Sequence, residues 1–218
     1  MNKFSFLAAS AAFILFACGE TPTADSSADA SNAQNEEVTP PVAALVDGDY
    51  TLNPDASEIV WVGTKVTGEH KGNIRLADGT LRVTEGRING GTITIDMTSI
   101  TNTDLDAENG ANLVGHLASD DFFGVENFPT ATFKFQEFAP TASGGILQGE
   151  LTIKGITQAN GAEVTVNAIE GGIEIRGVMK IDRTEFGIRY GSGTFFEDIG
   201  DKAISDFFEL GFFIVANS

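Results

Sequence analysis

Apolar and polar residues alternate in several segments between about residue 50 and the end of the chain. In residues 92–98, Ile93, Ile95 and Met97 stand between threonines and an aspartate. A period of two residues places one side of a β-strand against a core and the other in water. We therefore predict strands with one buried face here, and the same pattern marks residues 132–136, 150–154, 163–168 and 173–182.

Clusters of glycine with small polar residues accompany these segments and have the composition of tight turns. Tight turns join antiparallel neighbours, because parallel strands need crossover connections of a dozen or more residues. About eight such strands are typical of an all-β sandwich or barrel. The predicted turns are at residues 78–79, 85–86, 89–91, 143–145, 160–161 and 171–172.

One stretch, residues 104–123, lacks this alternation. Leu113, His116, Leu117 and Asp120 fall at the spacing of one helix face. The stretch therefore predicts one or two helical turns within an otherwise all-β domain.

The beginning of the chain has the pattern of an export signal. Lys3 precedes an apolar run over residues 4–17, which suits a signal peptide and is too short to cross a bilayer. The run ends at Cys18, the only cysteine, in a sequence that resembles the bacterial lipobox, where this cysteine becomes lipid-modified. An ordinary signal peptide followed by a chance cysteine is the alternative.

Residues 19–46 are rich in Ala, Ser, Thr and acidic residues and contain no Lys or Arg. Such a composition is typical of a disordered tether. We therefore predict a lipoprotein-type signal peptide over residues 1–17, a tether over residues 18–46 and one folded domain over residues 47–218.

The charge balance excludes several partners. The formal net charge is −18, and the 13 basic residues form no cluster. Binding to nucleic acid or to anionic lipid requires clustered Lys and Arg, so neither is expected. Attachment to a membrane is therefore expected through the lipid on Cys18. The lone cysteine also excludes a disulfide within the chain and a cysteine-based zinc site.

Several segments, taken together and in this order, resemble the YceI-like family. They are residues 50–54, 99–101, 116–123, 128–133, 149–157 and 183–188, within a region of about 49–217. The resemblance implies a single antiparallel, eight-stranded, lipocalin-like barrel exported to the bacterial cell envelope. It also implies a bound polyisoprenoid or isoprenoid quinone, since some members hold such a chain inside the barrel. The chain departs from the family pattern in its lipoprotein tether and in the position of His70.

An eight-stranded barrel either fills its interior with side chains or leaves room for one slim ligand. Alternation alone supports a solid core at least as well as a cavity, and only the family resemblance favours an apolar lipid. The residues expected to face the interior and bind that lipid are Trp61, Ile93, Ile95, Met97, Phe133, Phe135, Leu151, Ile153, Val166, Ile175, Met179 and Phe208.

No catalytic or metal site is expected. His70 and His116 have no partner at the spacing of a metal site, and no nucleophile–base pair is evident. The acidic clusters around residues 104–108 and 120–121 indicate a solvated face. An enzyme that uses His116 is therefore the least favoured interpretation.

Two pairs of adjacent phenylalanines, Phe122 with Phe123 and Phe195 with Phe196, either border the mouth of a barrel or plug its end, and we favour the plug. The sequence thus predicts an envelope lipoprotein that holds an isoprenoid or other apolar lipid, for transport or storage. The alternative is a non-enzymatic interaction or stress-response module with a solid core. Whether the chain forms a homodimer is left open.

Overall fold

The structure, a computed structural model, describes residues 45–218. The predicted signal peptide, the lipid site at Cys18 and nearly all of the predicted tether lie outside the described residues. These remain predictions.

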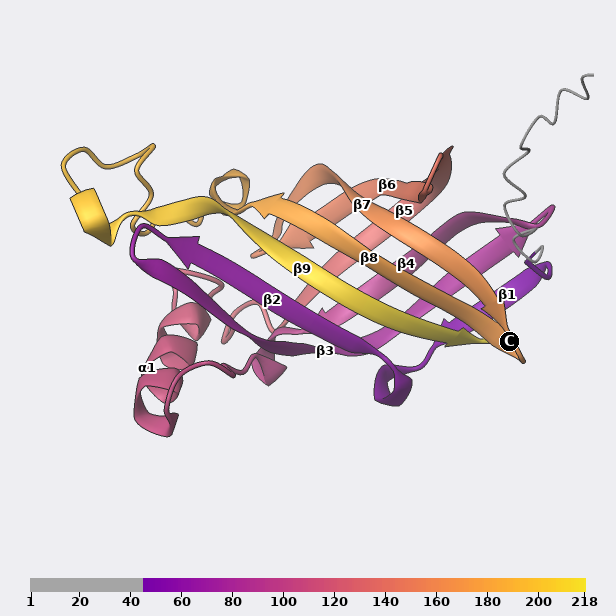
Figure 1. Cartoon of the computed structure of the whole chain (residues 1–218), viewed down its shortest axis with the longest axis horizontal. Helices are drawn as coiled ribbons and strands as arrows, with labels where there is room; N and C mark the ends of the chain where they lie inside the picture. Colours follow the sequence, from indigo (N-terminus) through magenta and orange to yellow (C-terminus); the bar gives the residue numbers. More distant parts are fainter. Residues whose placement is uncertain (1–44) are drawn as a thin grey trace, which may run out of the picture. The chain divides into compact units, whose positions relative to one another are not determined.

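The described residues form an antiparallel β-barrel with one α-helix (Figure 1). Strand β2 pairs with β3 and β9, and the remaining pairings run in sequence order from β3 to β9, so the sheet closes on itself. The strands are β1 (Gly48–Leu52), β2 (Glu58–Lys65), β3 (Gly68–Thr84), β4 (Arg87–Asp96), β5 (Thr130–Thr141), β6 (Gly144–Ile153), β7 (Ile156–Ile169), β8 (Gly172–Asp182) and β9 (Ile204–Asn217).

Strands β1 and β2 together occupy one position around the barrel. Both are antiparallel to β3 and to β9: Leu52 of β1 pairs with Ala216, and Ile59 of β2 pairs with Phe212. The short 3₁₀-helix η1 (Pro54–Ala56) interrupts them, and the Asn53 side chain caps it by accepting two backbone N–H groups. The nine strands within residues 45–218 therefore fill eight positions, which confirms the predicted eight-stranded barrel.

Helix α1 (Ala107–Ala118) occupies the stretch that lacks alternation, as predicted, and is longer than the one or two turns expected. Asp106 caps its first turn by accepting the N–H groups of Glu108 and Asn109. The 3₁₀-helix η2 (Met97–Ser99) connects β4 to the segment that leads to α1. Met97, the last apolar residue of the alternating pattern, therefore lies in η2 and not in the strand. Helix α1 lies at one end of the barrel, here called the α1 end, and β9 finishes at the other, the C-terminal end (Figure 1).

Three of the six predicted turns are wrong, because residues 78–79, 89–91 and 160–161 lie inside β3, β4 and β7. The β3–β4 pairing shifts register at two places, between Leu76 and Asp78 and between Arg82 and Val83. Glycine at a bulge or at a close backbone approach has the same local composition as a turn, which explains the error. A turn that was missed joins β6 to β7 through Lys154 and Gly155, both with positive φ (52° and 74°).

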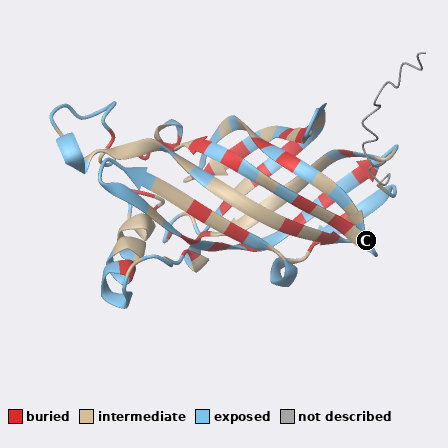
Figure 2. Ribbon diagram, in the orientation of Figure 1, coloured by how far each residue is buried: buried red, intermediate tan, exposed pale blue. Residues whose placement is uncertain are grey.

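The C-terminal half of the barrel is filled by side chains. Buried and exposed residues alternate along the strands, as Figure 2 shows. The rings of Phe133 and Phe135 are 5.9 Å apart, and Ile175 pairs with Ile214 on the neighbouring strand. Leu147, Ile173 and Ala216 are almost completely buried. This half has the dense core that a domain of this size without a disulfide requires.

Candidate ligand-binding cavity

A cavity of about 240 Å³ lies inside the α1 end of the barrel. Its walls are the inner faces of the strands, and Leu113 and Leu117 of α1 line it together with Phe122 and Phe123, which follow the helix. Of the polar residues in its lining, Thr64, Lys65, His70 and Ser205 are exposed or half-buried and belong to its edge, whereas Arg183 is almost completely buried. An apolar interior with polar groups at one side is the usual composition of a small-molecule site.

The twelve residues predicted to face the interior all lie in the core or are packed against it. Alternation identifies which face of a strand points inward, but it carries no information about the height of a residue along the barrel. Six of the twelve line the cavity: Trp61, Ile95, Met97, Leu151, Ile153 and Phe208. The other six belong to the core without lining the cavity: Ile93, Phe133, Phe135, Val166, Ile175 and Met179.

One wall of the cavity is built around Trp61. Its Nε1 donates a hydrogen bond of 2.9 Å to the carbonyl oxygen of Thr101, which holds the segment before α1 against the barrel. Gly72 of β3 allows this close approach, because a Cβ there would overlap the same carbonyl oxygen and lie 2.8 Å from the Trp61 ring. The segment that leads to α1 is thus fixed to β2 and β3.

His70 and Asp104 make a second attachment at the edge of the cavity. His70 Nδ1 is 2.8 Å from Asp104 Oδ2, and the backbone N–H of Lys71 donates to Asp104 Oδ1 at 2.9 Å. The Lys71 N–H, with the His70 and Asn102 side chains, lowers the pKa of Asp104 to about 2, although desolvation opposes this. His70 lies in β3 and pairs with Gly63 of β2.

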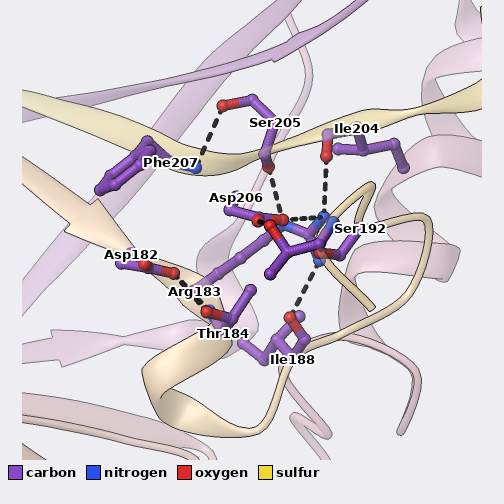
Figure 3. Close-up of polar contacts among 10 residues, drawn as sticks. Asp182, Arg183, Thr184, Ile188, Ser192, Ile204, Ser205, Asp206 and Phe207 are labelled. Carbon is purple, nitrogen blue, oxygen red and sulfur yellow. Dashed lines mark hydrogen bonds and ion pairs between the residues drawn. The ribbon is translucent and has the colours of Figure 1, made fainter. Parts of the chain in front are cut away.

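Arg183 is the buried charge beside the cavity, and sequence reasoning did not single it out. It begins the 3₁₀-helix η3 (Arg183–Phe186), and only 3% of the residue is exposed. Its guanidinium donates to the carbonyl oxygens of Ile188, Ile204 and Ser205 (Figure 3). In the sequence, Arg183 was marked only by its place in residues 183–188, one of the segments that resemble the YceI-like family.

Asp206 faces this guanidinium, with 3.6 Å between its Oδ1 and Arg183 Nη2. Burial lowers the pKa of Arg183, and the charges of Asp206 and Asp182 oppose this effect. Burial also acts to raise the pKa of Asp206, but hydrogen bonds from Ser192 and Thr194 and the charge of Arg183 lower it overall. Asp206 is therefore ionised at neutral pH, and its pair with Arg183 holds the start of β9 to η3.

A model of the YceI-like domain matches residues 50–216 of this chain, nearly the whole of the described barrel. The chain belongs to the YceI-like family.

Solved structures of similar fold include one from Burkholderia cenocepacia and one from Saccharophagus degradans. The crystal structure of BcnA from Burkholderia cenocepacia is 23% identical, with a TM-score of 0.62, and the match covers 76% of this chain and 99% of that one. A polyisoprenoid-binding domain from Saccharophagus degradans, implicated in plant cell wall breakdown, is 18% identical, with a TM-score of 0.57 and coverage of 78% and 98%. At these identities the likeness establishes the fold. No curated protein matches the chain.

The two phenylalanine pairs of this YceI-like domain have different environments. Phe122 and Phe123 line the cavity, and Phe122 is buried. Phe195 and Phe196 are 44% and 50% exposed, so the prediction that both pairs plug the barrel is wrong for the second.

The candidate catalytic histidine lies outside the cavity lining. The His116 ring meets Phe122 and Tyr190 edge-on at 4.8 and 4.5 Å, and its Nε2 is 3.9 Å from Asp121 Oδ2. Within residues 45–218 no group of three or more His, Cys, Asp or Glu side chains is placed to hold a metal ion. In the same range, no helix has both the length and the apolar character needed to cross a membrane.

Proposed function

We propose that this protein is an envelope lipoprotein whose barrel binds the apolar chain of an isoprenoid lipid, for transport or storage. The observation that carries the proposal is the apolar cavity at the α1 end. The family membership and the polyisoprenoid-binding domain of similar fold support the same class of ligand.

The size of the cavity favours a slim ligand. Its 240 Å³ is smaller than the roughly 300–1,000 Å³ of common small-molecule pockets. An extended hydrocarbon chain uses such a space well, because each buried CH₂ contributes about 0.8 kcal/mol. One five-carbon isoprene unit therefore contributes on the order of 3–4 kcal/mol before the costs of association.

The polar edge suits a ligand with one polar end. Lys65, His70, Thr64 and Ser205 lie where the head of a quinone or similar amphiphile would remain while its tail enters the barrel. A lipid on Cys18 would keep the protein at the membrane in which such ligands dissolve, since two or more acyl chains give stable anchoring. The proposed location is therefore the bacterial cell envelope, on a membrane facing the periplasm or at the cell surface.

The second candidate function is a non-enzymatic interaction module. The filled C-terminal half of the barrel favours it, because a solid core needs no ligand. The two candidates differ in whether the cavity at the α1 end holds a lipid in the cell.

The full chain would be expressed with export, and its bound lipid would be identified by native mass spectrometry followed by extraction. Leu117→Glu places a carboxylate in the cavity wall, whereas Ala111→Glu places the same charge on the exposed side of α1. We expect a discrete polyisoprenoid or quinone with the parent and Ala111→Glu, and its loss with Leu117→Glu. A parent without bound lipid that also takes up no added quinone would refute the proposal and favour the interaction module.

A further inference from the structure

Exposed apolar side chains gather at the α1 end of the barrel. Within residues 45–218, nine large apolar residues are exposed, and five of them form what is here called the apolar rim. The rim includes three phenylalanines and a tyrosine, each 44–50% exposed. Its members are Val66, Tyr190, Phe195, Phe196 and Phe207.

The rim is held in place at the edge of the cavity. Phe207 is both exposed and part of the cavity lining, so the rim and the cavity are continuous. The Val66 N–H donates to the Ala203 carbonyl oxygen at 3.2 Å, which ties the β2–β3 turn to the segment before β9. Thr194, next to Phe195, donates its hydroxyl to Asp206 Oδ2 at 2.6 Å.

The segment between β8 and β9 carries three of the five rim residues. It includes the 3₁₀-helix η4 (Gly200–Lys202) and projects beyond the barrel at the end where α1 lies (Figure 1). Most of its tip is exposed (Figure 2). A projecting apolar surface of this kind marks a contact site, because it would otherwise stand in water.

The chemistry of the rim fits a phospholipid bilayer. Aromatic rings concentrate at membrane interfaces, where their apolar bodies reach the acyl region. Two rings each carry a cation over one face: Arg189 lies 4.4 Å from the centre of Phe195, and Lys180 lies 4.6 Å from that of Phe207. Such cations can meet lipid phosphates while the rings insert.

The charge around the rim favours a zwitterionic surface. Glu197, Asp198 and Asp201 lie in the same segment and offset its cations. Electrostatic attraction to anionic lipid needs a polybasic cluster, which this segment lacks. Insertion of the rings, rather than net charge, is therefore the expected source of binding.

The length of the chain before the barrel allows this orientation. The described chain begins at Leu45, next to β1 and so toward the C-terminal end of the barrel, and 26 residues lie between Cys18 and Leu45. That segment spans up to roughly 90 Å when extended. A tilted strand of 14 residues, such as β9, covers only roughly 35 Å along a barrel axis. An anchor at Cys18 therefore permits the opposite end of the barrel to reach the same bilayer.

We propose that the apolar rim docks on a phospholipid bilayer, so that a lipid chain passes between the membrane and the cavity without crossing water. The transfer step rests on the proposed function, since it needs a cavity that binds a lipid. The docking step does not, and it can be tested by itself.

Docking is tested with the full chain reconstituted in phosphatidylcholine vesicles that contain a spin-labelled phosphatidylcholine. A polarity-sensitive fluorophore is attached at Phe196→Cys in one variant and at Ser143→Cys in another, the latter in the β5–β6 turn at the opposite end of the barrel. The parent, treated with the same fluorophore, shows how much label attaches to Cys18. We expect the label at position 196 to lose most of its fluorescence and the label at 143 to keep it. Equal quenching at both positions, or none at 196, would overturn the docking proposal.

Transfer is tested with a Phe195→Ser, Phe196→Ser double variant, and Ile169→Ser removes an exposed apolar residue at the C-terminal end as its control. We expect the double variant to take up a quinone from vesicles more slowly, by on the order of tenfold. Both variants should bind the same quinone normally when it is added from ethanol. Transfer at the parental rate by the double variant would refute the role of the rim. A parent that binds quinone from neither source would refute the proposed function instead.

Discussion

Arg183 Nη2 and Asp206 Oδ1 lie 3.6 Å apart beside the cavity, and this pair joins η3 to the beginning of β9. The same guanidinium donates to three backbone carbonyl oxygens, which belong to Ile188, Ile204 and Ser205. One buried side chain therefore fixes both ends of the segment that carries most of the apolar rim.

Replacing this arginine should be costly. Arg183→Met leaves Asp206 without its opposite charge and removes the donors to three carbonyl groups, so we expect the free energy of unfolding to fall by about 3–5 kcal/mol. Arg176→Met removes an exposed pair with Glu174 and should cost about 0–1 kcal/mol. Urea denaturation of both variants measures the difference. Similar losses from the two would mean that the buried pair has no special structural role.

Two glycine-to-alanine changes should have opposite signs. Gly72→Ala brings a methyl group onto the Thr101 carbonyl and the Trp61 ring, and overpacking of this kind costs about 1–3 kcal/mol. Gly115→Ala lies on the exposed side of α1, with nothing within 4 Å of the new methyl group, and should add roughly 0.5–1 kcal/mol of stability. Thermal unfolding distinguishes the two. A stabilising Gly72→Ala would show that the segment before α1 is not held as described.

Asp104 should make stability depend on pH in the acid range. Its folded-state pKa of about 2 lies below the ordinary value of 3.8, so its contribution is complete above about pH 4 and disappears as the pH falls toward 2. Asp104→Asn should therefore lower the melting temperature at neutral pH, and this deficit should shrink between pH 4 and pH 2. Melting curves across this range provide the test. A deficit that stays constant with pH would exclude the carboxylate as its source.

Trp61 should report directly on the cavity. It is the only tryptophan in the chain, and its ring lines the cavity wall. Titration of lipid-free protein with quinones should quench its fluorescence to saturation. Affinity should rise with each added isoprene unit until the cavity is full, and then become constant. Leu117→Glu should abolish the response and Ala111→Glu should preserve it, whereas an affinity independent of tail length would place the binding site elsewhere.

Much of the barrel was predictable from local pattern. Ile173, Ile175, Met179 and Ile181 alternate with polar residues, and all four are buried on β8. The absence of that pattern located α1 equally well. Glycine was a poorer guide, because Gly79, Gly90 and Gly161 lie within strands whereas Gly155 forms a turn. The same residue serves for a turn, a bulge or a close approach, and only the neighbouring strand decides which.

The sequence by itself determined the class of fold and the inward face of the strands, because both depend on a repeat of two residues along the chain. Tertiary structure alone decided which inward residues surround space and which meet other side chains. Leu151 lines the cavity and Phe133, its partner on β5, does not, although both face inward. Their difference, like the meeting of Arg183 with Asp206, depends on strands and loops that come together only when the barrel closes.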